Sequence, residues 1–175
     1  MYLVSLYFDN DTSRKIQRLI DKVASKSGNS SMIDGNVPPH ITIAAFHTNE
    51  ERRVIELLED IMKDIQSGVL TFASIGVFKS SVIYLAPVLN EYLHSLSVNI
   101  NEGMSSIKNI SISKFYIPFQ WIPHATIGKN MSSEQLMLAF QESVKEFCAF
   151  NGKVTRIGLT KTNPYEEIAV WNLEK

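Results

Sequence analysis

Two short segments of this chain each carry a histidine and a threonine that are separated by one residue. Both run proline, histidine, one residue, threonine and an aliphatic residue: Pro39-His40-Ile41-Thr42-Ile43 and Pro123-His124-Ala125-Thr126-Ile127. Successive side chains of a β-strand point to opposite faces, so a strand places each histidine on the same face as its threonine. Each segment is therefore predicted to present an imidazole and a hydroxyl on one face and to anchor its aliphatic residues in the core.

Two imidazoles and two hydroxyls in one site are suited to displacement at phosphorus. An unperturbed histidine titrates near pH ~6.5, so near neutrality one imidazole can act as a base while the other acts as an acid. The base removes a proton from the attacking hydroxyl or water, and the acid protonates the leaving oxygen. Thr42 and Thr126 can donate hydrogen bonds to the non-bridging oxygens, where charge builds up in the transition state.

A metal site is the first alternative for paired histidines. Zinc in proteins normally takes at least three protein ligands. The third would have to come from His47, His94 or a carboxylate, and no such residue recurs beside both segments. The sequence therefore favours a site without a metal or cofactor. A second alternative, in which His40 and His124 are hydrogen-bonded interior residues without a chemical role, stays open.

The spacing of the two segments recurs elsewhere in the chain. An offset of 84 residues separates His40 from His124, and the same offset separates two predicted helix-capping pairs, Thr48/Glu51 and Ser132/Gln135. An offset of 82 separates two Ile-Gly pairs, Ile75-Gly76 and Ile157-Gly158. We therefore predict an α+β protein with a duplicated two-lobe fold and pseudo-two-fold symmetry. Antiparallel sheets would line a central cleft, with the helices outside, in a single domain of repeats at about 1–80 and 81–175.

Apolar periodicity predicts the elements of this scaffold. Strands are expected near residues 2–8, 40–46, 69–78, 81–86, 111–119, 153–161 and 166–173, with turns at Lys79-Ser80 and Asn163-Pro164. The helix after Ser132 is expected to bury four apolar residues, Leu136, Phe140, Val144 and Phe147. Cys148, the single cysteine, is expected to be a buried, inert thiol.

Composition restricts the class of protein. The chain has 175 residues, 45% of them hydrophobic, and a net charge of −1. Proteins that grip a long duplex usually carry a basic excess, so duplex DNA is not an expected partner. The N-terminal segment lacks the basic region of a signal peptide, and no apolar run reaches membrane-spanning length. The expectation is a soluble cytoplasmic monomer that does not bind a membrane.

The paired segments His40-Ile41-Thr42-Ile43 and His124-Ala125-Thr126-Ile127 resemble the His-x-Thr-aliphatic motifs of the two-histidine (2H) phosphoesterase superfamily. The lead-in Trp121-Ile122-Pro123 and the length resemble its bacterial 2′-5′ RNA ligase and cyclic phosphodiesterase group. The resemblance implies two pseudo-symmetric lobes around a cleft. It further implies His40 as the general acid, His124 as the base that activates water, and both threonines as phosphate-binding residues.

Two further residues are predicted to bind substrate. Members of that group often carry a small residue and then an arginine after the second motif, where this chain has Gly128 and Lys129. Lysine offers a point charge in place of a bidentate fork. Base recognition requires an aromatic platform. Tyr116 is our candidate, ahead of Phe119 and Trp121, and a purely structural role for all three is the alternative.

The resemblance implies hydrolysis of 2′,3′-cyclic phosphates, or of 2′-5′ phosphodiesters, at RNA ends or in nucleotides. Some members also catalyse reversible, ATP-independent 2′-5′ joining. The expected partner is therefore an RNA terminus or a small nucleotide. Two alternatives stay open: an enzyme for another cyclic phosphate such as an ADP-ribose derivative, and a module that binds RNA ends or nucleotides without turnover.

Overall fold

The structure is a computed structural model that describes residues 1–79, 81–162 and 164–174. The predicted turns Lys79-Ser80 and Asn163-Pro164 each include one residue outside these ranges. In chain order the elements are β1 (Tyr2–Phe8), α1 (Asn10–Ser27), α2 (Ser31–Asp34), β2 (His40–His47), α3 (Glu51–Met62), β3 (Gly68–Phe78), β4 (Val82–Pro87), α4 (Glu91–Ser105), β5 (Ser111–Ile112), the 3₁₀ turn η1 (Lys114–Tyr116), β6 (Ala125–Gly128), α5 (Ser133–Glu146), β7 (Phe150–Lys161) and β8 (Glu166–Asn172).

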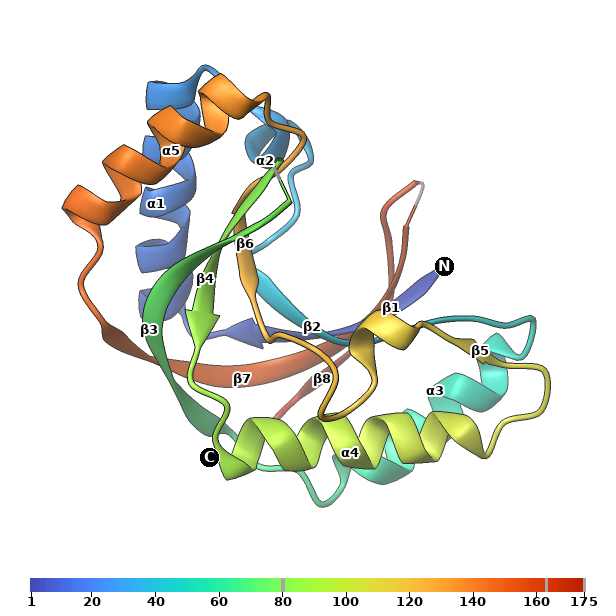
Figure 1. Cartoon of the computed structure of the whole chain (residues 1–175). Coiled ribbons are helices and arrows are strands. Elements are labelled where there is room, and N and C mark those ends of the chain that lie inside the picture. The colour runs from blue at the N-terminus through green and yellow to red at the C-terminus, as the bar shows by residue number, and fades with distance from the viewer. Residues whose placement is uncertain (80, 163, 175) are drawn as a thin grey trace.

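The strands form one continuous antiparallel sheet in the order β5-β2-β1-β7-β3-β4-β6, with β8 paired to β7 (Figure 1). The long strands β3 and β7 pair with each other through their first halves. Their second halves diverge, so that β3 continues beside β4 and β7 continues beside β1. The α+β class with antiparallel pairing is thus confirmed, and the two predicted sheets are the two halves of a single curved sheet.

The pairing registers follow the predicted repeat. Gly76 of β3 lies opposite Tyr84 of β4, and Gly158 of β7, 82 residues after Gly76, lies opposite Ser5 of β1. Leu70 of β3 lies opposite Gly152 of β7, again 82 residues apart, so the pseudo-two-fold axis passes between them. Each half of the sheet contains strands from both repeats. We therefore propose that the repeats fold together as one domain.

Amphipathic helices cover the outer side of both halves. Helices α1 and α5 pack together over the β6-β4-β3 half, and α3 and α4 lie beneath the β2-β1-β7 half (Figure 1). Asp9 caps α1 by accepting a hydrogen bond from the Thr12 amide at 2.9 Å, and Gly28 ends it in the left-handed conformation. This arrangement leaves the inner faces of the two halves free to form a cleft. No helix in the described ranges has both the length and the apolar character that crossing a bilayer requires.

One of the two predicted capping boxes is wrong. Ser132 and Gln135 form theirs at the start of α5. At α3 the N-cap is Glu50, whose amide donates to the Thr48 hydroxyl at 3.0 Å. The Glu51 carboxylate is diverted, because it accepts a hydrogen bond from Tyr2 at 2.9 Å and forms an ion pair with Lys161 at 2.6 Å. Tertiary partners that are distant in sequence therefore prevent the local box.

The predicted buried face of α5 is partly wrong. Phe140 is 38% exposed and Val144 is 55% exposed, whereas Ala139 and Ser143 are buried. Small residues on the contacting face let α5 approach α1 closely, which turns the larger side chains towards solvent. Cys148, which follows α5, is exposed, so the prediction of a buried thiol is wrong as well.

The strand predicted at residues 111–119 is also wrong. Only Ser111–Ile112 pairs, with the end of β2, and the chain then makes the turn η1. The Ser113 amide donates to the carbonyl oxygen of Ala45 at 2.8 Å, which ends the regular pairing. Phe119 adopts a positive φ of 64°, a conformation that no strand residue has. The apolar alternation in this segment therefore does not reflect a strand.

Candidate active site

The inner face of the sheet brings the two His-x-Thr segments together. On β2, His40 lies opposite Tyr7 of β1 and Thr42 lies opposite Ser5. In the other half, Thr126 of β6 lies opposite Tyr84 of β4. The alternate residues of both segments are fully buried in the core: Ile41, Ile43, Ala125 and Ile127. The predicted alternation therefore holds in both copies, and imidazole and hydroxyl share the inner face.

Both histidines are held by the same hydrogen bond. The Nδ1 atom of His40 lies 2.8 Å from the carbonyl oxygen of Pro38, and Nδ1 of His124 lies 2.7 Å from that of Ile122. A carbonyl oxygen only accepts, so Nδ1 carries the hydrogen and donates it in each case. Proton exchange with a substrate is left to Nε2. A neutral ring offers a lone pair there and acts as a base, and a charged ring offers a proton and acts as an acid.

The two imidazoles differ in their electrostatic surroundings. Burial lowers the pKa of His40, and the positive charges of His124 and Lys129 lower it further, against a smaller opposite effect of the Pro38 carbonyl. Burial also lowers the pKa of His124, opposed by its bond to the Ile122 carbonyl. Both rings are therefore neutral at neutral pH in the free protein. A bound anion would reverse this by stabilising a positive charge between the rings.

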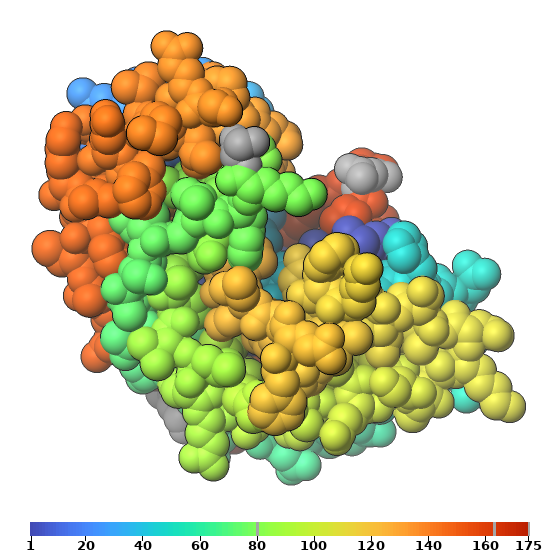
Figure 2. Space-filling view, in the orientation of Figure 1, coloured from blue at the N-terminus to red at the C-terminus, as the bar shows by residue number. Residues whose placement is uncertain are grey.

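A cavity of about 450 Å³ opens beside His40. Its lining residues come from both halves of the sheet, from the segment around α2 and from the β7–β8 hairpin: Leu3, Ser5, Tyr7, Met32, Gly35, Val37, His40, Thr126, Lys129, Thr160, Thr162 and Tyr165. Three of the predicted site residues, His40, Thr126 and Lys129, thus share one cavity. The space-filling view shows a hollow between the lobes on the face that it displays (Figure 2).

Thr42 and Thr126 occupy different settings within this site. Thr126 lines the cavity directly. Thr42 is only 6% exposed, and its hydroxyl oxygen lies 3.2 Å from that of Ser5, which does line the cavity. Thr42 can therefore reach a ligand only at the surface that Ser5 shares with it.

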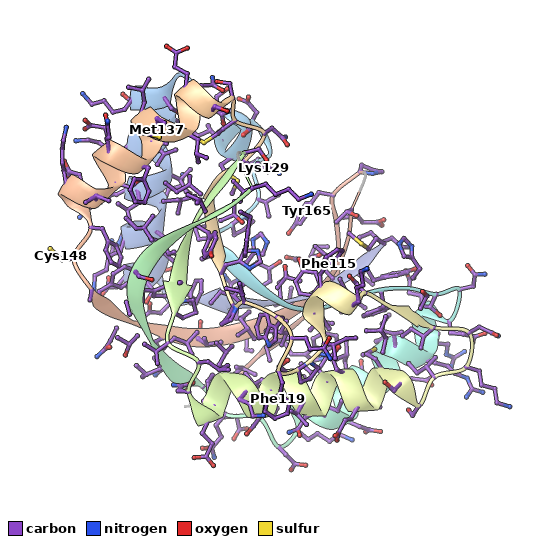
Figure 3. All side chains as sticks on the ribbon, viewed as in Figure 1. Phe115, Phe119, Lys129, Met137, Cys148 and Tyr165 are labelled. Carbon is purple, nitrogen blue, oxygen red and sulfur yellow. The ribbon has the colours of Figure 1, made fainter. Side chains whose placement is uncertain are left out.

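Lys129 follows β6, and its position is fixed through its backbone. The Ser31 hydroxyl donates to the Lys129 carbonyl oxygen at 2.5 Å, and the Asn29 amide group donates to that of Asn130 at 3.3 Å. At Gly128 a Cβ atom would collide with Met131 and Ile83, so the backbone packs tightly here. The side chain of Lys129 extends from this anchored turn towards the opening between the lobes (Figure 3). A cation at this place can attract a phosphate.

Tyr116 is not brought to the cavity. It lies in η1, half-buried, and packs against the hydrophobic core, and it does not line the cavity with His40. Trp121, another candidate platform, is buried at 7% exposure. The aromatic residues that do line the cavity are Tyr7 and Tyr165.

The aromatic surroundings of His124 were not singled out from the sequence. The rings of Phe78 and Tyr84 are stacked at 4.2 Å. His124 meets both edge-on, with centroid distances of 4.9 Å to Phe78 and 5.4 Å to Tyr84. Two signals could have indicated these positions: the alternation of β1, which places Ser5 and Tyr7 on one face, and the repeat, which makes Tyr84 the counterpart of Ser5.

The assembled groups can perform acid–base chemistry on an anion. Two imidazoles with available Nε2 atoms, two hydroxyls and one ammonium group face a shared space. Within the described part of the chain, no three His, Cys, Asp or Glu side chains are grouped so that they could hold a metal ion. The polar groups that are present fit a phosphate, which accepts hydrogen bonds from hydroxyls and carries charge that a lysine balances.

Comparison with known proteins places this geometry in context. Residues 11–166 match the model of the family described as the 2′-5′ RNA ligase superfamily. Among curated protein sequences none matches this chain significantly.

Solved structures share the fold over nearly the whole chain. Escherichia coli LigT complexed with 3′-AMP matches with a TM-score of 0.65 at 16% identity, covering 99% of this chain and 98% of that one. A structure described as a phosphoesterase matches at 0.64 and 14%, with 99% and 98% covered. Usb1 from Kluyveromyces marxianus matches at 0.52 and 13%, with 99% and 97% covered. These identities are low, so the likeness to these structures shows the fold alone.

Proposed function

The chain belongs to the 2′-5′ RNA ligase superfamily, and from that premise we propose that it is a metal-independent phosphodiesterase. Its substrates are 2′,3′-cyclic phosphates, or 2′-5′ phosphodiesters, of RNA ends or nucleotides. The observation that carries the proposal is the matched hydrogen bond from Nδ1 of His40 and His124 to the carbonyl oxygen two residues earlier, which leaves both Nε2 atoms for proton transfer.

The reaction needs one proton taken and one proton given. Nε2 of His124 removes a proton from water as the water oxygen bonds to phosphorus. Nε2 of His40 gives its proton to the 3′ oxygen as the bond between that oxygen and phosphorus breaks. The products are a 2′-phosphate and a 3′-hydroxyl, with the proton moved from one ring to the other. The acid and base assignments follow the family resemblance. The same groups in reverse support ATP-independent 2′-5′ joining.

The proton on His40 is supplied together with the substrate. Because its pKa is lowered in the free protein, His40 is neutral at neutral pH. A phosphate between the rings brings a negative charge that offsets the effect of Lys129 and favours protonation. Thr126, Lys129 and the Ser5–Thr42 pair hold its non-bridging oxygens, where charge grows in the transition state.

The nucleotide class is supported by the structural relatives. Structures of E. coli LigT are described as complexed with 3′-AMP, ATP and NADP⁺. A shared fold with such a protein favours a nucleotide ligand for this cavity. The expected partner is therefore an RNA terminus or a small nucleotide.

The test is hydrolysis of 2′,3′-cyclic nucleotides by pure protein in the presence of EDTA, with an ADP-ribose cyclic phosphate and a 2′-5′-linked dinucleotide in the same panel. We expect turnover of the 2′,3′-cyclic substrates that survives chelation. A requirement for added metal would refute the two-histidine mechanism. Turnover of the ADP-ribose derivative alone would move the substrate class, and tight nucleotide binding without any turnover would indicate a binding module.

A further inference from the structure

The cavity beside His40 extends beyond the place where a single phosphate would sit. It runs along β1 from Tyr7, the neighbour of His40, to Leu3, which lies opposite Thr160 of β7. Four residues of strand span about 13 Å. Thr162 and Tyr165 of the β7–β8 hairpin line the same cavity. A ligand whose phosphate lies between the histidines therefore has room to continue towards the hairpin.

Tyr165 offers an aromatic surface within this extension. It is 39% exposed and lines the cavity. Its hydroxyl lies close enough to Tyr7 to raise the pKa of that phenol, together with the larger effect of burial. Tyr165 therefore reaches from the hairpin back towards the neighbour of His40, and one nucleoside can lie against it.

The turn η1 stands at the edge of the same groove. Leu3 pairs with Ala45 of β2, and the carbonyl oxygen of Ala45 accepts the Ser113 amide hydrogen at 2.8 Å. The chain at the start of η1 is thus about two strand spacings, roughly 10 Å, from Leu3. Figure 3 shows Phe115, Tyr165 and Lys129 around the opening on one side of the molecule.

Phe115 is unusual for an aromatic residue because it is 72% exposed. Its neighbour Tyr116 packs against the core and fixes the turn, so that Phe115 projects outward from an anchored backbone. The Lys114 ammonium group lies 5.6 Å from the centre of the Phe115 ring. An open ring with a cation beside it is the combination that single-stranded nucleic acids use, because the base stacks while the cation attracts a phosphate.

Resting on the proposed function, we infer that Phe115 stacks on the base of the second nucleotide of an RNA end whose terminal phosphate lies between His40 and His124. Lys114 pairs with a phosphate of the same strand. The substrate is therefore a single-stranded RNA terminus of at least two nucleotides, in preference to a mononucleotide or an ADP-ribose derivative. Phe115 acts as a specificity-determining residue for chain length.

Binding of reaction products tests this inference without depending on turnover. The affinities of a hexanucleotide with a 2′-phosphate end and of the matching nucleoside 2′-phosphate are compared by fluorescence anisotropy and calorimetry. We expect the hexamer to bind more tightly, and Phe115→Ala to weaken hexamer binding by roughly 5- to 150-fold, the range for loss of one base stack. Phe115→Trp keeps an aromatic face and should restore it. Lys114→Gln should lower the salt-dependence slope of hexamer binding by about 0.7, the value for one phosphate on a single strand.

Phe119 provides a matched control from the same segment. It is 82% exposed, but its ring lies 4.3 Å from that of His94 on α4, and Figure 3 shows it over α4. Phe119→Gly suits the positive φ at this position and should leave hexamer binding unchanged. Equal affinity of wild type for hexamer and mononucleotide, or an equal loss in Phe119→Gly, overturns the inference. Absence of binding of both ligands overturns the nucleotide site and the proposed function with it.

Discussion

The two halves of the site have the same backbone but different side chains beside their histidines. In each half the threonine, its partner on the next strand and a glycine on the strand beyond stand in one row: Thr42–Ser5–Gly158 and Thr126–Tyr84–Gly76. The middle residue is a small hydroxyl in one half and an aromatic ring in the other. The duplicated scaffold places the histidines alike, and these cross-strand partners make their surroundings unlike.

This difference separates the roles of two otherwise equivalent rings. His40 lies beside Tyr7 at a centroid distance of 6.1 Å and is affected by the charge of Lys129. His124 is packed edge-on against the stacked rings of Phe78 and Tyr84. Acid and base roles in a paired site are assigned by environments that separate the pKa values of the two groups. The polar half therefore controls charge, and the aromatic half controls orientation.

The largest expected effect comes from removing either ring. His40→Ala and His124→Ala should each lower kcat for a 2′,3′-cyclic nucleotide by roughly 10²- to 10⁴-fold, because each ring supplies one proton transfer. Steady-state kinetics measure the loss. His47→Ala is the matched control, since His47 is exposed at the far end of β2, and it should retain full activity. Equal activity of either site variant and wild type would contradict the acid–base proposal.

The paired glycines test the two halves against each other. At Gly76 an added Cβ would collide with the Tyr84 ring, and at Gly158 it would collide with the Tyr7 ring. Gly76→Ala and Gly158→Ala should each lower the free energy of unfolding by about 1–3 kcal/mol, as overpacking does. Urea unfolding measures this.

Activity should distinguish the two alanine variants. Displacing Tyr84 disturbs the ring that orients His124, so Gly76→Ala should lower kcat more than Gly158→Ala does. Equal losses of kcat would show that the aromatic packing is not what orients His124.

Ser5→Ala should have a smaller effect, confined to the polar half. It removes the hydroxyl that lies 3.2 Å from that of Thr42 and leaves Thr42 without this buried partner. The expected loss is about 1 kcal/mol of stability, with a several-fold decrease in kcat/KM. Thermal unfolding and kinetics check both numbers. A stability equal to that of wild type would indicate that Thr42 finds another partner.

The smallest effect is a change in titration. Lys129→Met removes a positive charge that lowers the pKa of His40, so the pKa of His40 should rise, while that of His124, which burial controls, should stay. NMR titration of the two ring signals measures both, and Lys153→Met on β7 is the control. A parallel rise of both pKa values would contradict the proposed difference between the halves.

The local part of the site could be predicted from the sequence because strand alternation and an internal repeat are written directly in residue order. His40, Thr42, His124 and Thr126 share the inner face for that reason, and the offset between Gly76 and Gly158 indicated the true pairing registers. These features depend on period and spacing alone.

The remaining features depend on contacts between distant segments. The Glu51 carboxylate meets Tyr2 and Lys161, which no local pattern indicates. The exposed position of Phe115 and the inward position of Tyr116 are set by the bond between Ser113 and Ala45, which changes a strand-like pattern into a turn. Tyr165 reaches the cavity only because its hairpin folds back towards Tyr7.

The exchange of strands between the repeats also bears on how the molecule is made. β1 supports the strand of His40, and its other neighbour is β7, near the opposite end of the chain. A growing polypeptide that has emerged as far as β6 already holds both histidines and both threonines, but it lacks the strand that completes the His40 half. Contacts between such distant segments form late and slow the folding of β-rich domains. Catalytic competence should therefore arise in one step, when β7 inserts between β1 and β3.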